Sequence, residues 1–269
     1  WQFGDTTTYS LNFYEPYLWK SDFSFGFSIY DRESKRDEYL RKTAGGSITF
    51  GHPLPKDWRT SLKYRVENAE TIWDDESLEI EAIDLRSFNL GLSRDSSNNR
   101  FHPTSGSINN FDVEHAGDFI GGEVDFTKFN IDTRRYFPGF KNHALALRMK
   151  LGISYPRTAI PSSEQYILGG SDTLRGYERS DFEREDFDNN NLLLFNVEYR
   201  IPFNESFTGV VFTDAGNVWE NRDSISLSDL NYGYGLGMRM NTPVGQLRLD
   251  YGWDEDQDGQ LHFSIGNTF

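Results

Sequence analysis

The stretch ALALRMKLGISY, residues 144–155, decides the fold class of this chain. Its odd positions carry leucine, methionine, isoleucine and tyrosine, whereas its even positions carry alanine, arginine, lysine, glycine and serine. Because successive side chains of a β-strand point to opposite faces of a sheet, this alternation predicts a strand with one apolar and one polar face. A helix would instead repeat its apolar positions every three or four residues.

The same alternation recurs along the rest of the chain. It is clearest in residues 193–201, 231–241 and 246–253, and noisier copies lie at 9–13, 23–29, 62–66, 88–92, 111–113 and 129–131. We count about thirteen candidate strands and find no stretch with a helical pattern. The chain is therefore predicted to be all-β.

The connections between these segments are of two kinds. Every other connection is short and contains proline, as in Glu15-Pro16, Phe137-Pro138-Gly139 and Ile201-Pro202-Phe203. The intervening connections are longer and charged, and lie at residues 31–38, 68–84, 155–190, 220–230 and 254–258. Transmembrane β-barrels have short turns at one end and long loops at the other. The pattern therefore predicts a transmembrane antiparallel β-barrel.

Composition excludes several other classes of protein. The 269 residues are 36% hydrophobic, and no apolar run is longer than the four residues Leu192–Phe195. A membrane-spanning helix needs about 20 apolar residues, so a bundle of membrane helices is excluded. An aromatic content of 16% is too high for a disordered tail. The net charge of −15 argues against binding of nucleic acid. With no cysteine, neither a disulfide framework nor a thiolate metal site is available.

A soluble β-sandwich or lipocalin-like barrel would also alternate, and it is the alternative fold. A soluble barrel fills its interior with apolar side chains and usually has about 8 to 10 strands. A larger barrel encloses water and needs its polar face inside. The polar faces here are rich in glycine, serine, asparagine and paired opposite charges. This composition suits a wet interior and favours the membrane barrel.

Residues 168–177, LGGSDTLRGY, carry the most specific motif. They resemble the loop motif G-G-x-x-x-[VL]-R-G-[FY] of the outer-membrane β-barrel superfamily that contains the BamA insertase, TamA and the two-partner-secretion transporters. The residues that match are Gly169, Gly170, Leu174, Arg175, Gly176 and Tyr177. Further family-like segments lie at residues 12–17, 101–106, 196–202 and 211–219, in the order of the family. The resemblance covers the chain from about Tyr9 to its last residue and is strongest to the barrel domain of the insertase branch.

The last segment, GQLHFSIGNTF at residues 259–269, is similar to the C-terminal β-signal of bacterial outer-membrane barrels. Its apolar positions are Leu261, Phe263 and Ile265, and it ends on Phe269. In such barrels a final strand that closes on an aromatic residue is read by the assembly machinery. We therefore expect these four residues to act as a β-signal.

The resemblance implies a function in the bacterial outer membrane. It implies insertion and folding of β-barrel proteins through a lateral seam, without catalytic residues, cofactors or metal. Unfolded outer-membrane protein clients, the lipid bilayer and accessory lipoproteins are the implied partners. The alternative is a polypeptide-translocating transporter, either TamA-like or of the two-partner-secretion type, and a porin or an outer-membrane hydrolase is less favoured.

The family has about sixteen strands and periplasmic POTRA repeats before them, and single-chain barrels have an even number of strands. Residues 1–269 are therefore expected to be the C-terminal barrel domain, with the first strands and the POTRA repeats missing from this sequence.

Arg175 has two predicted carboxylate partners. Glu198 lies on the polar face of its strand, and a turn near 204–206 brings Asp214 opposite or diagonal to it. Two facing carboxylates repel each other, and a planar, permanently charged guanidinium between them reverses the sign of the interaction. The resemblance implies that this loop folds into the barrel and that Arg175 meets these acidic positions. The alternative is that Arg175 is a surface charge and Glu198 a solvated residue.

Other candidate motifs fail. The run from Asp254 to Gly259 imitates the first half of an EF-hand loop, but the position of the bidentate glutamate is Ile265. We interpret this run as a solvated hairpin loop. The five histidines lack the i, i+4 spacing of a zinc site, and no G-x-S-x-G motif occurs. The sequence gives no indication of an enzyme.

Overall fold

A computed structural model describes residues 6–35, 39–73, 81–100, 102–179, 181–182, 188–242 and 245–266. The strands in these ranges are β1 (Thr6–Glu15), β2 (Ser24–Lys35), β3 (Tyr39–Pro53), β4 (Trp58–Trp73), β5 (Glu81–Asp95), β6 (Gly106–Ala116), β7 (Phe126–Pro138), β8 (Ala144–Pro156), β9 (Asn191–Pro202), β10 (Phe207–Trp219), β11 (Asn231–Thr242), β12 (Gly245–Trp253) and β13 (Gly259–Ile265). Short 3-10 helices lie at η1 (Leu18–Lys20), η2 (Asp118–Ile120), η3 (Phe140–Asn142), η4 (Ser162–Glu164), η5 (Arg222–Ser224) and η6 (Leu227–Asp229). None of the helices in the described ranges is long and apolar enough to cross a membrane.

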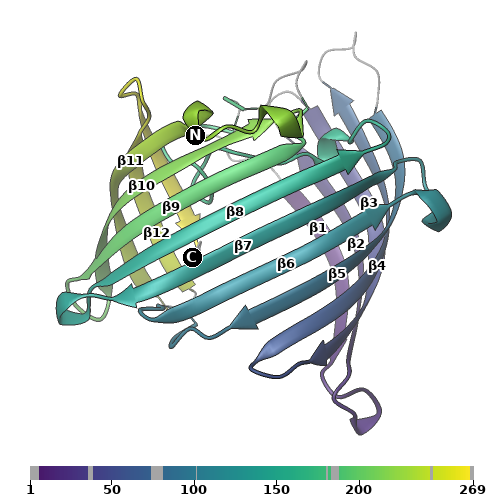
Figure 1. Cartoon of the computed structure of the whole chain (residues 1–269), viewed down its shortest axis with the longest axis horizontal. Coiled ribbons are helices and arrows are strands. Elements are labelled where there is room, and N and C mark those ends of the chain that lie inside the picture. Colours follow the sequence, from purple (N-terminus) through teal and green to yellow (C-terminus); the bar gives the residue numbers. More distant parts are fainter. Residues whose placement is uncertain are drawn as a thin grey trace. The chain divides into compact units, whose positions relative to one another are not determined.

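The strands form one sheet in which each strand pairs with its neighbours in the sequence, in the order β1 to β13. The pairs from β1 to β4 and from β8 to β13 are antiparallel, and Figure 1 shows β8 to β11 as adjacent long arrows. Among the described strands, β1 pairs with β2 alone and β13 pairs with β12 alone. The prediction of an all-β chain with about thirteen strands is confirmed, and the strands follow one another in the sheet as a meander.

Several strands run further than the alternation predicted. The expected loops at 31–38 and 68–84 are partly strand, because β2 continues to Lys35 and β4 to Trp73. The register explains this extension, since Glu33 lies opposite Lys42, which in turn lies opposite Glu70. Opposite charges across a ladder stabilise it, so the ladder continues where both faces have become polar.

The prolines mark the short turns as predicted. Strands β3, β7 and β9 each end on the proline of a short connection. Strands β3 and β10 had no clear alternation, because Gly45-Gly46 interrupts the first and Val210-Val211-Phe212 the second. Both are nevertheless paired along their length. The partner strands, and not local sequence, determine these two elements.

The contacts divide the chain into two compact units. Unit 1 contains Trp1–Ser93, Asp112–Phe129 and Ser154–Gln165, and unit 2 contains Arg94–Phe111, Asn130–Ile153 and Tyr166–Phe269. Strands β1 to β4 lie in unit 1, and strands β9 to β13 lie in unit 2. The segment between β8 and β9 contributes residues to both units.

The apolar face of the sheet is exposed, as lipid-facing strands require. In β11 the side chains of Tyr232, Tyr234 and Leu236 are exposed, and Leu236 is 56% exposed. Of the alternate positions, Gly233, Gly235 and Arg239 are buried. In unit 1 the apolar residues of β1 are exposed as well. A soluble barrel would bury these rows, so the alternative soluble fold is wrong.

Leu236→Arg tests which face meets lipid. A charge on the lipid side of a strand should lower the free energy of unfolding in a bilayer by roughly 2–4 kcal/mol near the midplane. Urea titration of protein folded into vesicles, followed by tryptophan fluorescence, measures this change. Leu227→Arg is the matched control, because Leu227 is exposed in η6 and lies outside the strands. Equal stability of the two variants would show that the β11 row does not face lipid.

Candidate functional site

The segment between β8 and β9 folds back on itself over the motif 168–177. The main-chain N–H of Gly170 donates to the carbonyl of Tyr177 at 2.9 Å, and the Thr173 hydroxyl donates to the Gly169 carbonyl at 2.8 Å. Gly169 has φ +83°, and a Cβ there would lie 2.2 Å from the Glu178 carbonyl oxygen. Only glycine fits this tight crossing.

Leu174 anchors the motif through apolar packing against the strands. Its side chain is fully buried. The cluster around it consists of Leu168, Phe182, Leu192, Leu194 and Val218, with Tyr166 and Tyr177 packed against it. Leu192, Leu194 and Val218 come from β9 and β10, so apolar contacts fix the loop on the same face that carries the charges described next.

Arg175 is the centre of the site and is only 1% exposed. Its Nε and Nη2 donate to the two carboxylate oxygens of Asp214 at 2.7 and 2.8 Å, and its main-chain N–H donates to the same carboxylate at 3.1 Å. Its Nη1 donates to Glu198 Oε1 at 2.6 Å. The structure thus brings together the three charged residues that the sequence singled out, and Arg175 is not a surface charge. Asp214 lies opposite Asn196 and Phe212 lies opposite Glu198, so the two carboxylates are diagonal neighbours.

Further charges surround this triad. We call the Arg175 network the set Arg175, Arg200, Arg239, Arg248, Asp172, Glu198, Asp214 and Asp250. Arg239 joins two of its carboxylates, since it contacts Glu198 at 3.0 Å and Asp250 at 2.6 Å. The network holds four arginines and four carboxylates and is therefore neutral. Buried charges need such complete pairing, because each unpaired one is costly.

The aromatic ring of Phe212 packs against one face of the Arg175 guanidinium. The Arg175 Cζ atom lies 3.6 Å from the centre of the buried Phe212 ring. A guanidinium over an aromatic face gains a cation–π attraction. This contact explains why an aromatic residue lies on the polar face of β10 and why the run Val210-Val211-Phe212 breaks the alternation.

Glycines of β11 and β12 form the surface on which the tip of the loop rests. A Cβ at Gly233 would lie 1.9 Å from the Arg175 carbonyl oxygen, and a Cβ at Gly252 would lie 2.7 Å from the Gly176 nitrogen. A Cβ at Gly235 would meet the Phe212 ring at 2.5 Å. Because these positions have no side chain, the loop backbone approaches the strand backbone directly.

The carbonyl groups of the loop also receive donors from the strands. The carbonyl of Ser171 accepts from Arg248 at 2.9 Å, that of Asp172 from Arg148 at 3.0 Å, and that of Thr173 from Asn196 at 2.7 Å. Three consecutive main-chain carbonyls of the loop thus accept hydrogen bonds from strand side chains.

The tip of the loop reaches the last described strand. The main-chain N–H of Gly176 donates to Nε2 of His262 in β13 at 3.1 Å. The Tyr177 hydroxyl donates to the carbonyl of Tyr232 at 3.3 Å, and burial raises the pKa of Tyr177 to about 12. The loop therefore contacts β9 to β13 from one side.

The predicted β-signal falls on β13. Leu261, Phe263 and Ile265 are exposed on the apolar face of this strand. Phe269 lies outside the described residues. The role of all four residues as a signal stays a prediction.

The acidic run from Asp254 to Asp258 forms the turn between β12 and β13. The Asp258 N–H donates to the Asp254 carboxylate at 2.8 Å. Within the described ranges, no group of three or more histidine, cysteine, aspartate or glutamate residues is placed to hold a metal ion.

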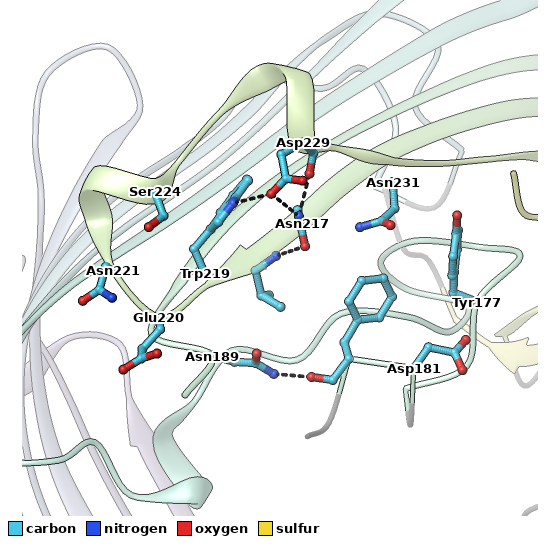
Figure 2. A pocket seen from close by; sticks show the side chains of 12 residues that line it. Tyr177, Asp181, Asn189, Asn217, Trp219, Glu220, Asn221, Ser224, Asp229 and Asn231 are labelled. Carbon is cyan, nitrogen blue, oxygen red and sulfur yellow. Dashed lines mark hydrogen bonds between the residues drawn. The ribbon is translucent and has the colours of Figure 1, made fainter. Parts of the chain in front are cut away.

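A cavity of about 450 Å³ lies beside the loop, at the ends of β9 to β11 near Trp219 and Asn231. Figure 2 shows that Asp229 accepts hydrogen bonds from Asn217 and from the Trp219 ring nitrogen, which lies 3.1 Å away. Of the predicted site residues, only Tyr177 lines this cavity. The polar groups in it hold the β10–β11 connection to the strands.

The sequence did not identify several residues that shape the site. Arg239, Arg248 and Asp250 lie at the polar positions of the alternating segments 231–241 and 246–253, and only this facing indicated that they could reach the loop. Phe212 gave no signal, because it lies in a run of three consecutive apolar residues, Val210-Val211-Phe212. His262 was considered only as a possible metal ligand.

Residues 2–269 match the family model of the Omp85 superfamily domain. The chain is 28% identical to the outer membrane protein assembly factor BamA of Nitratidesulfovibrio vulgaris, over an alignment that covers 99% of this chain and 37% of that protein. The chain therefore spans well under half the length of this relative.

Two solved structures are similar in fold. BamA from Haemophilus ducreyi lacking POTRA domains 1–3 superposes with a TM-score of 0.80 at 18% identity, over 97% of this chain and 61% of that one. CdiB from Acinetobacter baumannii superposes with a TM-score of 0.68 at 14% identity, over 97% of this chain and 50% of that one. The fold class predicted from the sequence, a transmembrane antiparallel β-barrel, is confirmed.

Arg175→Ala should strongly destabilise unit 2. The substitution leaves the Asp214 carboxylate buried without its guanidinium partner, although the Asn196 amide still donates to it at 2.8 Å. Removing one partner of a buried ion pair costs roughly 3–5 kcal/mol. Urea unfolding of protein in vesicles measures the loss. Arg157→Ala is the matched control, because Arg157 precedes the motif in the same connection and is 68% exposed. A loss below about 1 kcal/mol, as expected for an exposed pair, would contradict the buried network.

Gly233→Ala should displace the tip of the loop. The new methyl group would meet the Arg175 carbonyl oxygen, and overpacking of this kind costs roughly 1–3 kcal/mol. Protease cleavage after Arg175 or Arg179 should become faster and is followed by gel electrophoresis. Gly26→Ala is the control, because a Cβ at this strand glycine meets its nearest atom at an ordinary 3.4 Å. Equal cleavage rates for both variants would argue against the close approach.

Proposed function

The chain belongs to the Omp85 superfamily, and we propose that it is the barrel of an outer-membrane protein assembly factor. In this role it inserts and folds β-barrel proteins into the bacterial outer membrane through a lateral seam. The similarity to the BamA of N. vulgaris over nearly the whole chain supports this proposal. Because the chain spans 37% of that relative, the activity belongs to a longer protein that is proposed to carry further strands and POTRA repeats.

One observation carries the proposal: the loop that Arg175 fixes also reaches the edge of the sheet. Gly176 contacts His262 of β13, and Arg239 and Arg175 both lie beside Asp250 of β12. The loop thus holds the polar side of the last two described strands, while their apolar side is left to lipid. A seam at β13 would open beside a sheet that is braced on one face.

The proposed mechanism follows from the rule that no unpaired backbone group can face hydrocarbon. Strand β13 has one paired neighbour among the described strands. When the seam at β13 opens in the longer protein, the N–H and C=O groups of this strand become available to a strand of the client, which adds by β-augmentation. Each client strand that pairs removes its own backbone groups from water without exposing them to lipid. The Arg175 network keeps β12 in register during this exchange.

No catalytic side chain or cofactor enters this mechanism. Hydrogen bonds are exchanged between strands, and no covalent bond forms or breaks. The partners in the proposal are unfolded outer-membrane proteins, the bilayer and accessory lipoproteins.

A polypeptide-translocating transporter of the same superfamily is the alternative, and the likeness to CdiB in fold is compatible with it. A translocase would pass an unfolded chain through the interior, whereas an insertase releases its client sideways. Single-channel conductance that a bound client blocks would favour the translocase. A folded client in the same membrane would favour the insertase.

The full-length protein reconstituted in liposomes should accelerate the folding of a β-barrel client into the same bilayer. Folding is measured by the shift in gel mobility of unheated samples. Arg175→Ala should remove most of the acceleration, because the loop is no longer fixed against β12 and β13. Arg157→Ala should leave the acceleration unchanged.

The activity proposal fails if the wild-type liposomes fold the client no faster than empty ones. The role of the loop fails if Arg175→Ala matches the wild type in both its own stability and client folding.

A further inference from the structure

The connection between β8 and β9 has a second docked segment, residues 160–165, which lies in unit 1. Ile160 is 3% exposed and packs in a cluster with Leu85, Ala116, Val124 and Phe126. The Ser162 hydroxyl accepts a hydrogen bond from Arg41 of β3 at 3.0 Å. This segment precedes the motif at 168–177 and shares no residue with the Arg175 network.

Glu164 makes the strongest contacts of this segment. Its Oε1 lies 3.0 Å from Nη1 of Arg65 in β4, and its Oε2 lies 3.3 Å from Nζ of Lys128 in β7. Lys128 also donates to the main-chain carbonyl of Glu164. The Glu164 side chain is 10% exposed, so both pairs are shielded from water and stronger than surface ion pairs.

The strands do not need Glu164 to balance their own charges. Arg65 also pairs with Glu114 at 2.7 Å and with Glu67 at 3.7 Å. The strand residues Arg65, Lys128, Glu67 and Glu114 already sum to zero charge. If Glu164 loses its charge, the charged strand residues still sum to zero. A substitution of Glu164 should therefore weaken the contact between residues 160–165 and the strands more than it weakens the pairing of the strands themselves.

We propose that Glu164 is a positioning residue that fastens the first half of the β8–β9 connection. The connection is then held at two places, by Glu164 in unit 1 and by Arg175 in unit 2. This inference rests on the proposed function, because it makes insertion depend on both fastenings. Glu164 acts through the position of the loop and contacts no client.

Engineered thiols test whether Glu164 holds the segment in place. Residues 1–269 contain no cysteine, so Thr71→Cys with Ser162→Cys introduces the only two thiols of this part of the protein. The two hydroxyl oxygens lie 3.4 Å apart, which is close enough for a disulfide after a small adjustment. The pair should cross-link rapidly on oxidation. Adding Glu164→Gln should slow the cross-linking about tenfold, the size expected for the loss of a charge-assisted hydrogen bond.

The same variants test the effect on insertion. In liposomes with the full-length protein, Glu164→Gln should slow client folding by about tenfold, in line with the loss of one charged contact. In the Glu164→Gln variant that also carries the two cysteines, oxidation to the disulfide should restore the wild-type rate of client folding. Reduction of the disulfide should return the rate to the slow value of Glu164→Gln. The disulfide returns the segment to its place but not the carboxylate, so restoration separates positioning from a local effect of charge.

Glu33→Gln is the matched control, because Glu33 is an exposed glutamate of the same unit, and it should leave both rates unchanged. Should Glu164→Gln not fold, Glu164→Asp shortens the side chain, weakens its ion pairs with Arg65 and Lys128, and should slow client folding in the same direction.

Three results would overturn the proposal: unchanged cross-linking in Glu164→Gln, unchanged insertion in the same variant, or a slow rate that the disulfide does not restore. If the wild type itself fails to accelerate folding, the proposed function is wrong, and the cross-linking rate alone decides whether Glu164 seats the loop.

Discussion

The structure depends on a guanidinium that is buried against carboxylates. Arg175 cannot lose its proton, so the polar face around it must supply full negative charge and complete hydrogen bonding. Asp214 provides a bidentate partner, Glu198 a second one, and Phe212 a flat aromatic surface. The two carboxylates come from different strands, Glu198 from β9 and Asp214 from β10, so Arg175 sets the position of both strands relative to the loop. The interaction therefore aligns a loop with several strands at once, which a single apolar contact could not do.

The alternation of residues made most of the fold predictable. A period of two predicts both that a segment is a strand and which residues share a face of it. The polar positions of Glu198 and Asp214 followed from this pattern. Only the family motif indicated that Arg175 would contact them. What alternation cannot supply is the order of contacts across the sheet. The extension of β2 and β4 into charged segments depends on cross-strand pairs such as Glu33 and Lys42, which are far apart in the sequence. The run Val210-Val211-Phe212 is apolar at every position, so the local pattern does not show which face Phe212 occupies.

The β8–β9 connection is held by Arg175 and by Glu164, and only the first of these two contacts could be predicted from the sequence. The glycines and the arginine at 168–177 form a compact motif whose spacing carries information. Glu164 stands beside no motif, and its partners Arg65 and Lys128 come from strands more than thirty residues away. Its environment exists only after the part of the sheet from β4 to β7 has formed. Ordinary charged residues of long loops can thus acquire specific roles that only tertiary structure reveals.

The bare backbone of β11 beneath Arg175 limits how this strand can change its length. Glycine alternates there with large side chains, Tyr232 and Tyr234 among them, so a slip of one residue exchanges the two rows. An insertion or deletion within the strand would place a tyrosine ring where the loop now touches main chain and would turn the glycines toward lipid. Lineages of this protein should therefore tolerate length variation in the outer loops while β11 keeps its residue count.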